Sequence, residues 1–219
     1  MIKKQIKEFL ITQPNMHVVE ENNSNFSLQG IYHFSGIWDE ISYEKDYKLK
    51  IEITEDFPLS MPKVFCCDNY FDGYSHLNPD KSFCLGVLID NYLKMQHSPT
   101  ILNFFKLLVD PYIYSFEYCK EFGFMPFGER EHGLEGVWEF YKEYFCEPDT
   151  EKCARLFVYV VKNDSYRGHH LCPCGSGIKT RKCHGNVLNK IFKQKTDRAY
   201  AMLLTKDMED FIKNVKRSK

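Results

Sequence analysis

The segment Cys172–His184 constrains the fold of this chain most, because it places four metal-binding side chains within thirteen residues. A Cys-x-Cys pair is followed by eight residues and an adjacent Cys-His pair, which gives the candidate ligands Cys172, Cys174, Cys183 and His184. Zinc binds thiolates and imidazoles in a tetrahedron, and two closely spaced pairs that fold back on each other can supply it. Because protein fills all four positions, the pattern predicts one structural Zn²⁺ per chain.

The alternative for these cysteines is a set of disulfides or free thiols, and the spacing favours the metal. Gly175 and Gly177 favour a tight turn after the first pair. His169 and His170 lie nearby, but four ligands are already available, so we expect both to be surface residues.

The sequence Cys-Pro-Cys-Gly-Ser-Gly at residues 172–177 resembles the SEC-C motif, a small zinc knuckle found at the end of SecA and appended to many bacterial proteins. His184 fills a position that is Cys or His in that family. The resemblance implies a zinc knuckle that serves as a structural element.

Length and composition allow one sizeable core with a small appendage, since the chain has 219 residues and is 43% hydrophobic. Nine cysteines without a recognisable signal peptide predict a reducing, cytoplasmic location. No apolar stretch approaches the length of a membrane span, so we expect no membrane partner.

The net charge of −1 hides an asymmetry along the chain. Residues 177–219 carry 12 Lys and Arg against 4 Asp and Glu, whereas the remainder carries 17 against 26. A basic segment beside an acidic body can bind an acidic protein surface or nucleic acid, and more often it is a solvated helix face.

Apolar periodicity predicts an α+β fold. An amphipathic helix is expected over residues 2–12, and alternating apolar residues predict strands at 26–35, 46–54 and 63–67. Residues 68–97 are rich in polar residues and glycine, so we expect a long irregular loop, which usually carries function.

Helices are expected after this loop. Pro99 behind Ser98 predicts a helix start, and Pro111 separates a further helix that runs through Cys119. Asp149 or Thr150 is expected to cap one of the later helices. These later helices are predicted at 132–146, 150–161 and 187–216, with a linker at 163–167. The expected domains are therefore 1–162 and 163–219.

Four short motifs in order resemble the ubiquitin-conjugating enzyme family over roughly residues 1–125. Residues 56–64, Asp-Phe-Pro-Leu-Ser-Met-Pro-Lys-Val, are similar to its Tyr-Pro-x-x-x-Pro-x-Val signature. His76-Leu77-Asn78 followed by Cys84-Leu85 is similar to its His-Pro-Asn motif and active-site Cys-Leu. Ser-Pro at 98–99 and Leu-Leu-x-x-Pro at 107–111 are similar to the bounds of its next helix.

The departures from the family point to its bacterial relatives. The segment between His76 and Cys84 is shorter than in eukaryotic members, Leu77 replaces the middle Pro, and the Gly before the cysteine is missing. Some bacterial relatives occur in anti-phage operons beside a cyclic-oligonucleotide synthase, so the resemblance names such a synthase as one candidate partner. It also implies a ubiquitin-like modifier or another protein with an activated C-terminus, supplied by a separate activating enzyme or another donor.

The resemblance implies an enzyme that holds an acyl group as a thioester on Cys84 and transfers it to a lysine amine. It assigns Asn78 as the donor to the tetrahedral oxyanion and His76 as a brace of the loop. Asp80, Asp90 and His97 are candidates to assist the attacking lysine.

Two alternatives remain open in the sequence. Cys84 lies among apolar residues, so it could be a buried packing thiol, as we expect for Cys119, Cys146 and Cys153. The chain could also be a non-catalytic adaptor that binds a protein or nucleic acid through the knuckle and basic segment. One of the adjacent cysteines at 66 and 67 is expected to face the core, because they alternate on a strand.

Overall fold

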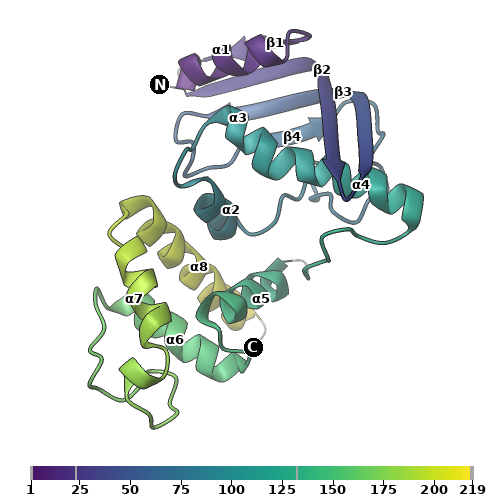
Figure 1. Cartoon of the computed structure of the whole chain (residues 1–219). Coiled ribbons are helices and arrows are strands. Elements are labelled where there is room, and N and C mark those ends of the chain that lie inside the picture. The colour runs from purple at the N-terminus through teal and green to yellow at the C-terminus, as the bar shows by residue number, and fades with distance from the viewer. Residues whose placement is uncertain (1, 23, 132, 218–219) are drawn as a thin grey trace. The chain divides into compact units, whose positions relative to one another are not determined.

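The computed structural model describes residues 2–22, 24–131 and 133–217. They form two compact units; in Figure 1 the first is coloured from purple to teal, and the second, apart from residues 87–90, from green to yellow. The first unit comprises Met1–Gly86 and Asn91–Glu129, and the second comprises Val87–Asp90 and Arg130–Lys219.

The first unit is an α+β structure in which a four-stranded antiparallel sheet carries helices (Figure 1). Its strands follow chain order and are β1 (Met16–Glu21), β2 (Asn25–Trp38), β3 (Ile41–Thr54) and β4 (Lys63–Cys66). The helical segments are α1 (Ile2–Thr12), α3 (Ile101–Phe104), the π-helical η1 (Phe105–Val109) and α4 (Asp110–Phe122).

The predicted first helix and three strands are confirmed, because their apolar periodicity matches the buried faces. Ile2, Ile6 and Phe9 are the buried residues of α1, at helical spacing. β2 and β3 form a long hairpin in which Trp38 pairs with Ile41. Asp39 and Glu40, with φ of 47° and 67°, make its two-residue turn, as the right-handed twist of paired strands favours.

Strand β1 was not predicted. Met16 is its single buried residue, so the sequence shows no alternation there. Gly30 of β2 has φ of +151°, and a Cβ at this position would lie 2.2 Å from the carbonyl oxygen of Asn15. Glycine therefore permits the close approach of the two chain segments where β1 begins.

The helix predicted to start at Pro99 begins two residues later, at Ile101. The hydroxyl of Thr100 accepts a hydrogen bond from the Asn103 amide at 3.2 Å and caps the helix. Pro111 was predicted to separate two helices, but the helical segments are continuous there, because the π-helical η1 joins α3 to α4. Pro111 lies in the first turn of α4, where no backbone N–H is needed. α4 extends beyond the predicted Cys119 to Phe122.

The segment 68–97 is not irregular throughout. It contains α2 (Leu88–Met95), whose buried hydrophobic residues Ile89, Tyr92 and Met95 recur every third position. This helix is too short for its pattern to stand out from the polar residues around it.

Besides residues 87–90, the described part of the second unit contains four α-helices and one 3₁₀ turn. They are α5 (Gly133–Phe145), α6 (Thr150–Lys162), the 3₁₀ turn η2 (Thr180–Lys182), α7 (Gly185–Gln194) and α8 (Arg198–Arg217). The helices predicted at 132–146 and 150–161 are confirmed, apart from residue 132, which lies outside the described residues. The Asp149 carboxylate caps α6 by accepting from the Lys152 amide at 2.9 Å.

One aromatic core joins α5 and α6 to the segments that follow them. Tyr141 and Phe157 have ring centroids 4.3 Å apart, and the Tyr141 hydroxyl donates to Asp207 of α8 at 2.6 Å. The main boundary between the compact units therefore lies at 129/130, whereas the sequence predicted it at 162/163. The reason is that α5 and α6 bury their apolar faces against α7 and α8.

The single helix predicted over 187–216 is two helices. Lys195 ends α7, and the Asp197 carboxylate accepts from the Ala199 amide at 2.9 Å at the start of α8. The Lys195 ammonium donates to the carbonyl oxygens of Val160 at 2.8 Å and Val161 at 3.2 Å at the end of α6. Among the described residues, no helix combines the length and apolar character needed to cross a membrane.

Candidate functional site

The four predicted metal ligands lie together in the second unit. Their potential ligand atoms are all within 4.8 Å of one another, and Cys172 and Cys174 are buried. The Cys172 amide donates to the Ile178 carbonyl at 2.7 Å, and the Gly175 amide donates back to the Cys172 carbonyl at 3.0 Å. These bonds fold residues 172–179 into a tight loop that returns the chain to Cys183.

Gly175 lets this loop lie against α6. Its φ is +86°, and a Cβ there would meet the guanidinium of Arg155 at 2.2 Å. The second pair of ligands follows the η2 turn, in which the Cys183 amide donates to the Thr180 carbonyl at 3.0 Å. His184 directly precedes α7.

Three of the distances within the cluster are close to those expected between the ligands of a four-coordinate metal. His184 Nδ1 lies 3.4 Å from the Cys172 sulfur and 3.2 Å from the Cys183 sulfur, and the Cys174 and Cys183 sulfurs are 3.7 Å apart. A tetrahedron with metal–sulfur bonds of about 2.3 Å and metal–nitrogen bonds of about 2.0 Å has edges of about 3.8 Å and 3.5 Å, respectively. The donor set is therefore suited to a metal ion in both chemistry and spacing.

A disulfide does not account for the cluster. The separation of 3.7 Å between the Cys174 and Cys183 sulfurs far exceeds the length of a covalent S–S bond, about 2.05 Å, and all three cysteines are free thiols. Burial raises the pKa of the Cys172 thiol to about 11. A bound cation would oppose this effect, because it stabilises the thiolate.

Glu147 is a member of this site that the sequence did not indicate. Its Oε2 atom lies 3.5 Å from His184 Nε2, and the two side chains are only 12% and 11% exposed. A carboxylate on the outer nitrogen of a ligating histidine fixes the ring and its tautomer. Glu147 lies between α5 and α6, 37 positions before His184, and no local motif connects them.

His169 and His170 lie outside the Cys/His cluster, as predicted. Both side chains are exposed, and their rings contact each other with centroids 4.5 Å apart.

Cys84 lies in a small hairpin of the first unit. The Cys84 amide donates to the His76 carbonyl at 2.8 Å, Leu77 bridges to Phe83, and the Asn78 amide donates to the Ser82 carbonyl at 2.8 Å. At its tip, the Lys81 amide donates to the Asn78 carbonyl, and Lys81 has a φ of 68°, as expected at the third position of a three-residue hairpin loop.

Alternation along the hairpin separates its side chains into two faces. Phe83 is buried in the core, where its ring stacks on that of Tyr112 at 4.3 Å between centroids. His76, Asn78 and Cys84 therefore belong to the opposite face, since side chains two residues apart share a face. Cys84 is half-buried, so this thiol is neither fully enclosed in the core nor fully exposed.

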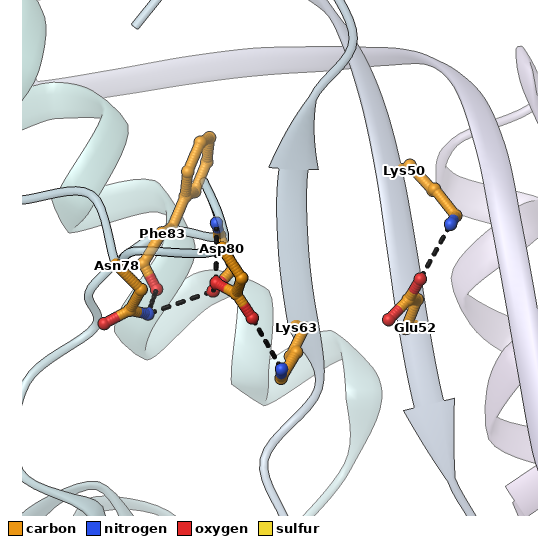
Figure 2. A network of polar contacts seen from close by, with 7 residues as sticks. Lys50, Glu52, Lys63, Asn78, Asp80 and Phe83 are labelled. Carbon is orange, nitrogen blue, oxygen red and sulfur yellow. Dashed lines mark hydrogen bonds and ion pairs between the residues drawn. The ribbon is translucent and has the colours of Figure 1, made fainter. Parts of the chain in front are cut away.

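The Asn78 side chain is fixed within the hairpin. Its amide nitrogen donates to the Ser82 hydroxyl at 3.0 Å and to the Phe83 carbonyl at 3.1 Å (Figure 2). Both N–H groups are therefore in use, and donation to an oxyanion would require the side chain to release one of them.

His76 is held from both its backbone and its ring. The Tyr112 hydroxyl donates to the His76 carbonyl at 2.9 Å. The ring nitrogen Nε2 lies 3.3 Å from the Glu129 carboxylate, and the ring contacts that of Tyr74 at 5.2 Å between centroids. These contacts anchor the first strand of the hairpin to α4 and to the segment after it.

The three candidates for assisting a lysine differ in their positions. Lys63 and Ser82 hold Asp80 by hydrogen bonds that lower the pKa of its carboxyl to about 2, so this group is a weak base. Asp90 belongs to the second compact unit, and His97 is exposed after α2.

The remaining cysteines divide between core and surface. Cys66 is packed against the core and Cys67 is exposed, in agreement with the predicted alternation, and burial raises the pKa of the Cys66 thiol to about 11. Cys153 is fully buried and Cys119 is half-buried. Cys146 is exposed and not a packing residue, because it lies beyond the end of α5 with a φ of 53°.

A comparison of this chain with protein-family models, with curated proteins and with solved structures found no match. The support for the α+β architecture and for the Cys/His cluster therefore comes from the sequence and structure of this chain alone.

Proposed function

We propose that this protein is a bacterial ubiquitin-conjugating-like enzyme that carries the C-terminus of a partner protein as a thioester on Cys84 and transfers it to a lysine amine. The observation that supports this most directly is the hairpin 76–84. It pairs His76 with Cys84 and places both on the same face as Asn78, within a frame of helix, antiparallel sheet and helix.

The chemistry needs a thiol that an activated acyl donor can reach. The half-buried Cys84 meets this need, and the hairpin hydrogen bonds fix its backbone. The acyl group enters by thiol exchange, so the protein must hold the cysteine in position and exclude competing nucleophiles. It need not supply a strong base for loading.

We propose that the metal is Zn²⁺ in a structural role. Three thiolates and one imidazole from this chain complete a tetrahedron, which leaves no position for substrate. The site would then stabilise the loop between α6 and α7, and through it the helices of the second unit. This role agrees with the resemblance of residues 172–184 to the SEC-C knuckle.

Loading of Cys84 tests the proposed enzyme. The full chain would be incubated with a short peptide thioester that ends in Gly-Gly, and the adduct would be located by mass spectrometry. We expect a thiol-sensitive adduct on Cys84 that the Cys84→Ala variant lacks, whereas Cys67→Ala, which removes an exposed thiol, keeps it. Equal labelling of wild type and Cys84→Ala would refute the thioester.

One observation favours an adaptor as the second candidate. The knuckle exposes two apolar side chains, Leu171 at 67% and Ile178 at 48%, beside exposed Lys179 and Arg181. An adaptor would keep its biological output in Cys84→Ala and lose it in Leu171→Ser with Ile178→Ser. A mobility-shift assay with nucleic acid separates a nucleic-acid ligand from a protein partner, and either contact should weaken with salt.

Point substitutions test the adaptor better than removal of residues 169–219 would. Truncation would remove α7 and α8, which share a core with α5 and α6. A truncated chain would therefore expose that core as well as lose the basic segment.

A further inference from the structure

A directed chain of polar contacts runs from β4 to the side chain of Asn78 (Figure 2). Lys63 on β4 donates to Asp80 Oδ2 at 2.6 Å, and the Ser82 hydroxyl donates to Asp80 Oδ1 at 2.6 Å. The Asn78 amide then meets both the Ser82 hydroxyl at 3.0 Å and the Phe83 carbonyl at 3.1 Å. These five residues all belong to the first compact unit.

The partners determine which end of the Asn78 amide faces inward. Asp80 is ionised at neutral pH and can only accept, so it takes the single hydroxyl proton of Ser82. The Ser82 oxygen can then only accept from Asn78, and the Phe83 carbonyl is also an acceptor. Both neighbours therefore require the amide nitrogen, and the Oδ1 atom of Asn78 points away from them, as Figure 2 shows.

Asn78 shares a face of the hairpin with Cys84. Asn78 lies opposite Ser82, and Cys84 is two residues beyond Ser82 on the same strand. Such diagonal neighbours in an antiparallel pair are about 7–8 Å apart, a span that a longer side chain or a bound acyl group can bridge.

We propose that Asn78 acts as a hydrogen-bond acceptor for the attacking amine, which its Oδ1 atom orients toward a thioester on Cys84. Lys63 and Asp80 are positioning residues, because they fix the proton of Ser82 and hence the orientation of the Asn78 amide. This inference rests on the proposed function and specifies the nucleophile that the site selects.

In the transfer step, the lone pair of the neutral amine forms a C–N bond to the thioester carbonyl carbon. The C–S bond then breaks, and its electron pair leaves with the sulfur of Cys84. One N–H of the amine is held by Asn78 Oδ1, and the proton that the nitrogen loses passes to solvent, since an amide oxygen is too weak a base to keep it. The products are an amide and the Cys84 thiolate.

An acceptor and an oxyanion donor make different predictions for different nucleophiles. Every tetrahedral intermediate carries an oxyanion, so loss of a donor slows transfer to amines and thiols alike. An acceptor for N–H groups assists amines, whereas a thiolate has no proton to donate. A residue that only braces the loop would affect loading and both transfers together.

The test compares the discharge of a Gly-Gly peptide from Cys84 to L-lysine and to β-mercaptoethanol, after loading from the peptide thioester. We expect Asn78→Ala to slow transfer to lysine by roughly 10- to 100-fold, as loss of orientation typically does, with less than about a twofold change for the thiol. Asp80→Asn should cause a smaller loss in the same direction, because Ser82 is then free to reverse its hydrogen bond. Lys81→Met is the matched control, since Lys81 lies in the same turn but pairs with Asp72.

Equal slowing of both discharges by Asn78→Ala, or no slowing of either, would overturn the proposal while leaving the thioester in place. If Asn78→Ala fails to fold or load, the Asp80→Asn variant decides by the same comparison. Absence of any Cys84 adduct in the wild-type protein would overturn the proposed function and this inference with it.

Discussion

Replacement of Glu147 by alanine tests whether the Cys/His cluster binds a metal and whether Glu147 holds the His184 ring in place for it. His184 Nδ1 faces the sulfurs of Cys172 and Cys183, so a metal bound there would leave the proton on Nε2, which lies 3.5 Å from Glu147 Oε2. Removing the carboxylate leaves a ligand that can rotate and change tautomer. We expect the Glu147→Ala variant to bind zinc more weakly.

The geometry sets the size of the effect. Hydrogen bonds to charged groups contribute about 1.5–3 kcal/mol, and 3.5 Å is at the long limit of such a bond, which favours the lower value. A loss of about 1.4 kcal/mol is a tenfold change in dissociation constant, at the lower end of the 10- to 100-fold typical of such partners. Glu147→Gln keeps an acceptor oxygen without the charge, so a smaller loss is expected.

The assay is a competition titration of Zn²⁺ between the protein and a chromophoric chelator. Glu151→Ala is the matched control, since this carboxylate is 75% exposed on α6 and pairs with Arg155, so its removal should leave zinc affinity unchanged. The reasoning is refuted if Glu147→Ala binds zinc as tightly as the wild type while Cys183→Ser does not bind it.

Three further predictions follow from the structure. Chelation of the metal, or Cys183→Ser, should increase amide hydrogen exchange in the second unit and leave the first unit folded. Unchanged protection of the amides in the second unit would contradict this. Lys195→Met should lower the free energy of unfolding by about 1–3 kcal/mol in urea titrations, because the carbonyl groups at the end of α6 lose a donor whose side chain is only 12% exposed. An unchanged midpoint would contradict this. Burial raises the pKa of Asp110 to about 6, so folding stability should fall by up to about 3 kcal/mol as pH rises from 4 to 6, since the folded state binds the proton more tightly than the unfolded state. Asp110→Asn should flatten that slope in thermal melts, and a persisting slope would assign it to another group.

The Cys/His cluster could be predicted from the sequence because its four residues are close together in the chain. Four donors within thirteen residues leave few ways to fold other than around a common centre, and the turn after Cys174 needs only the glycines beside it. The main strands and the first helix were predictable for a related reason. Each has one buried face, and the spacing of its apolar residues can be read from one continuous stretch of sequence.

Tertiary structure alone decided the features that depend on residues far apart in the chain. Glu147 reaches His184 only because α5 and α6 fold against α7, and the same shared core joins residues 130–162 to the knuckle. Strand β1 forms because it pairs with β2 in the antiparallel sheet, although its own sequence lacks apolar alternation. The orientation of the Asn78 amide likewise follows from Lys63 on another strand, through Asp80 and Ser82. A sequence pattern records which faces are apolar and which donors are close in the chain, whereas the partner of a single polar side chain is chosen by long-range packing.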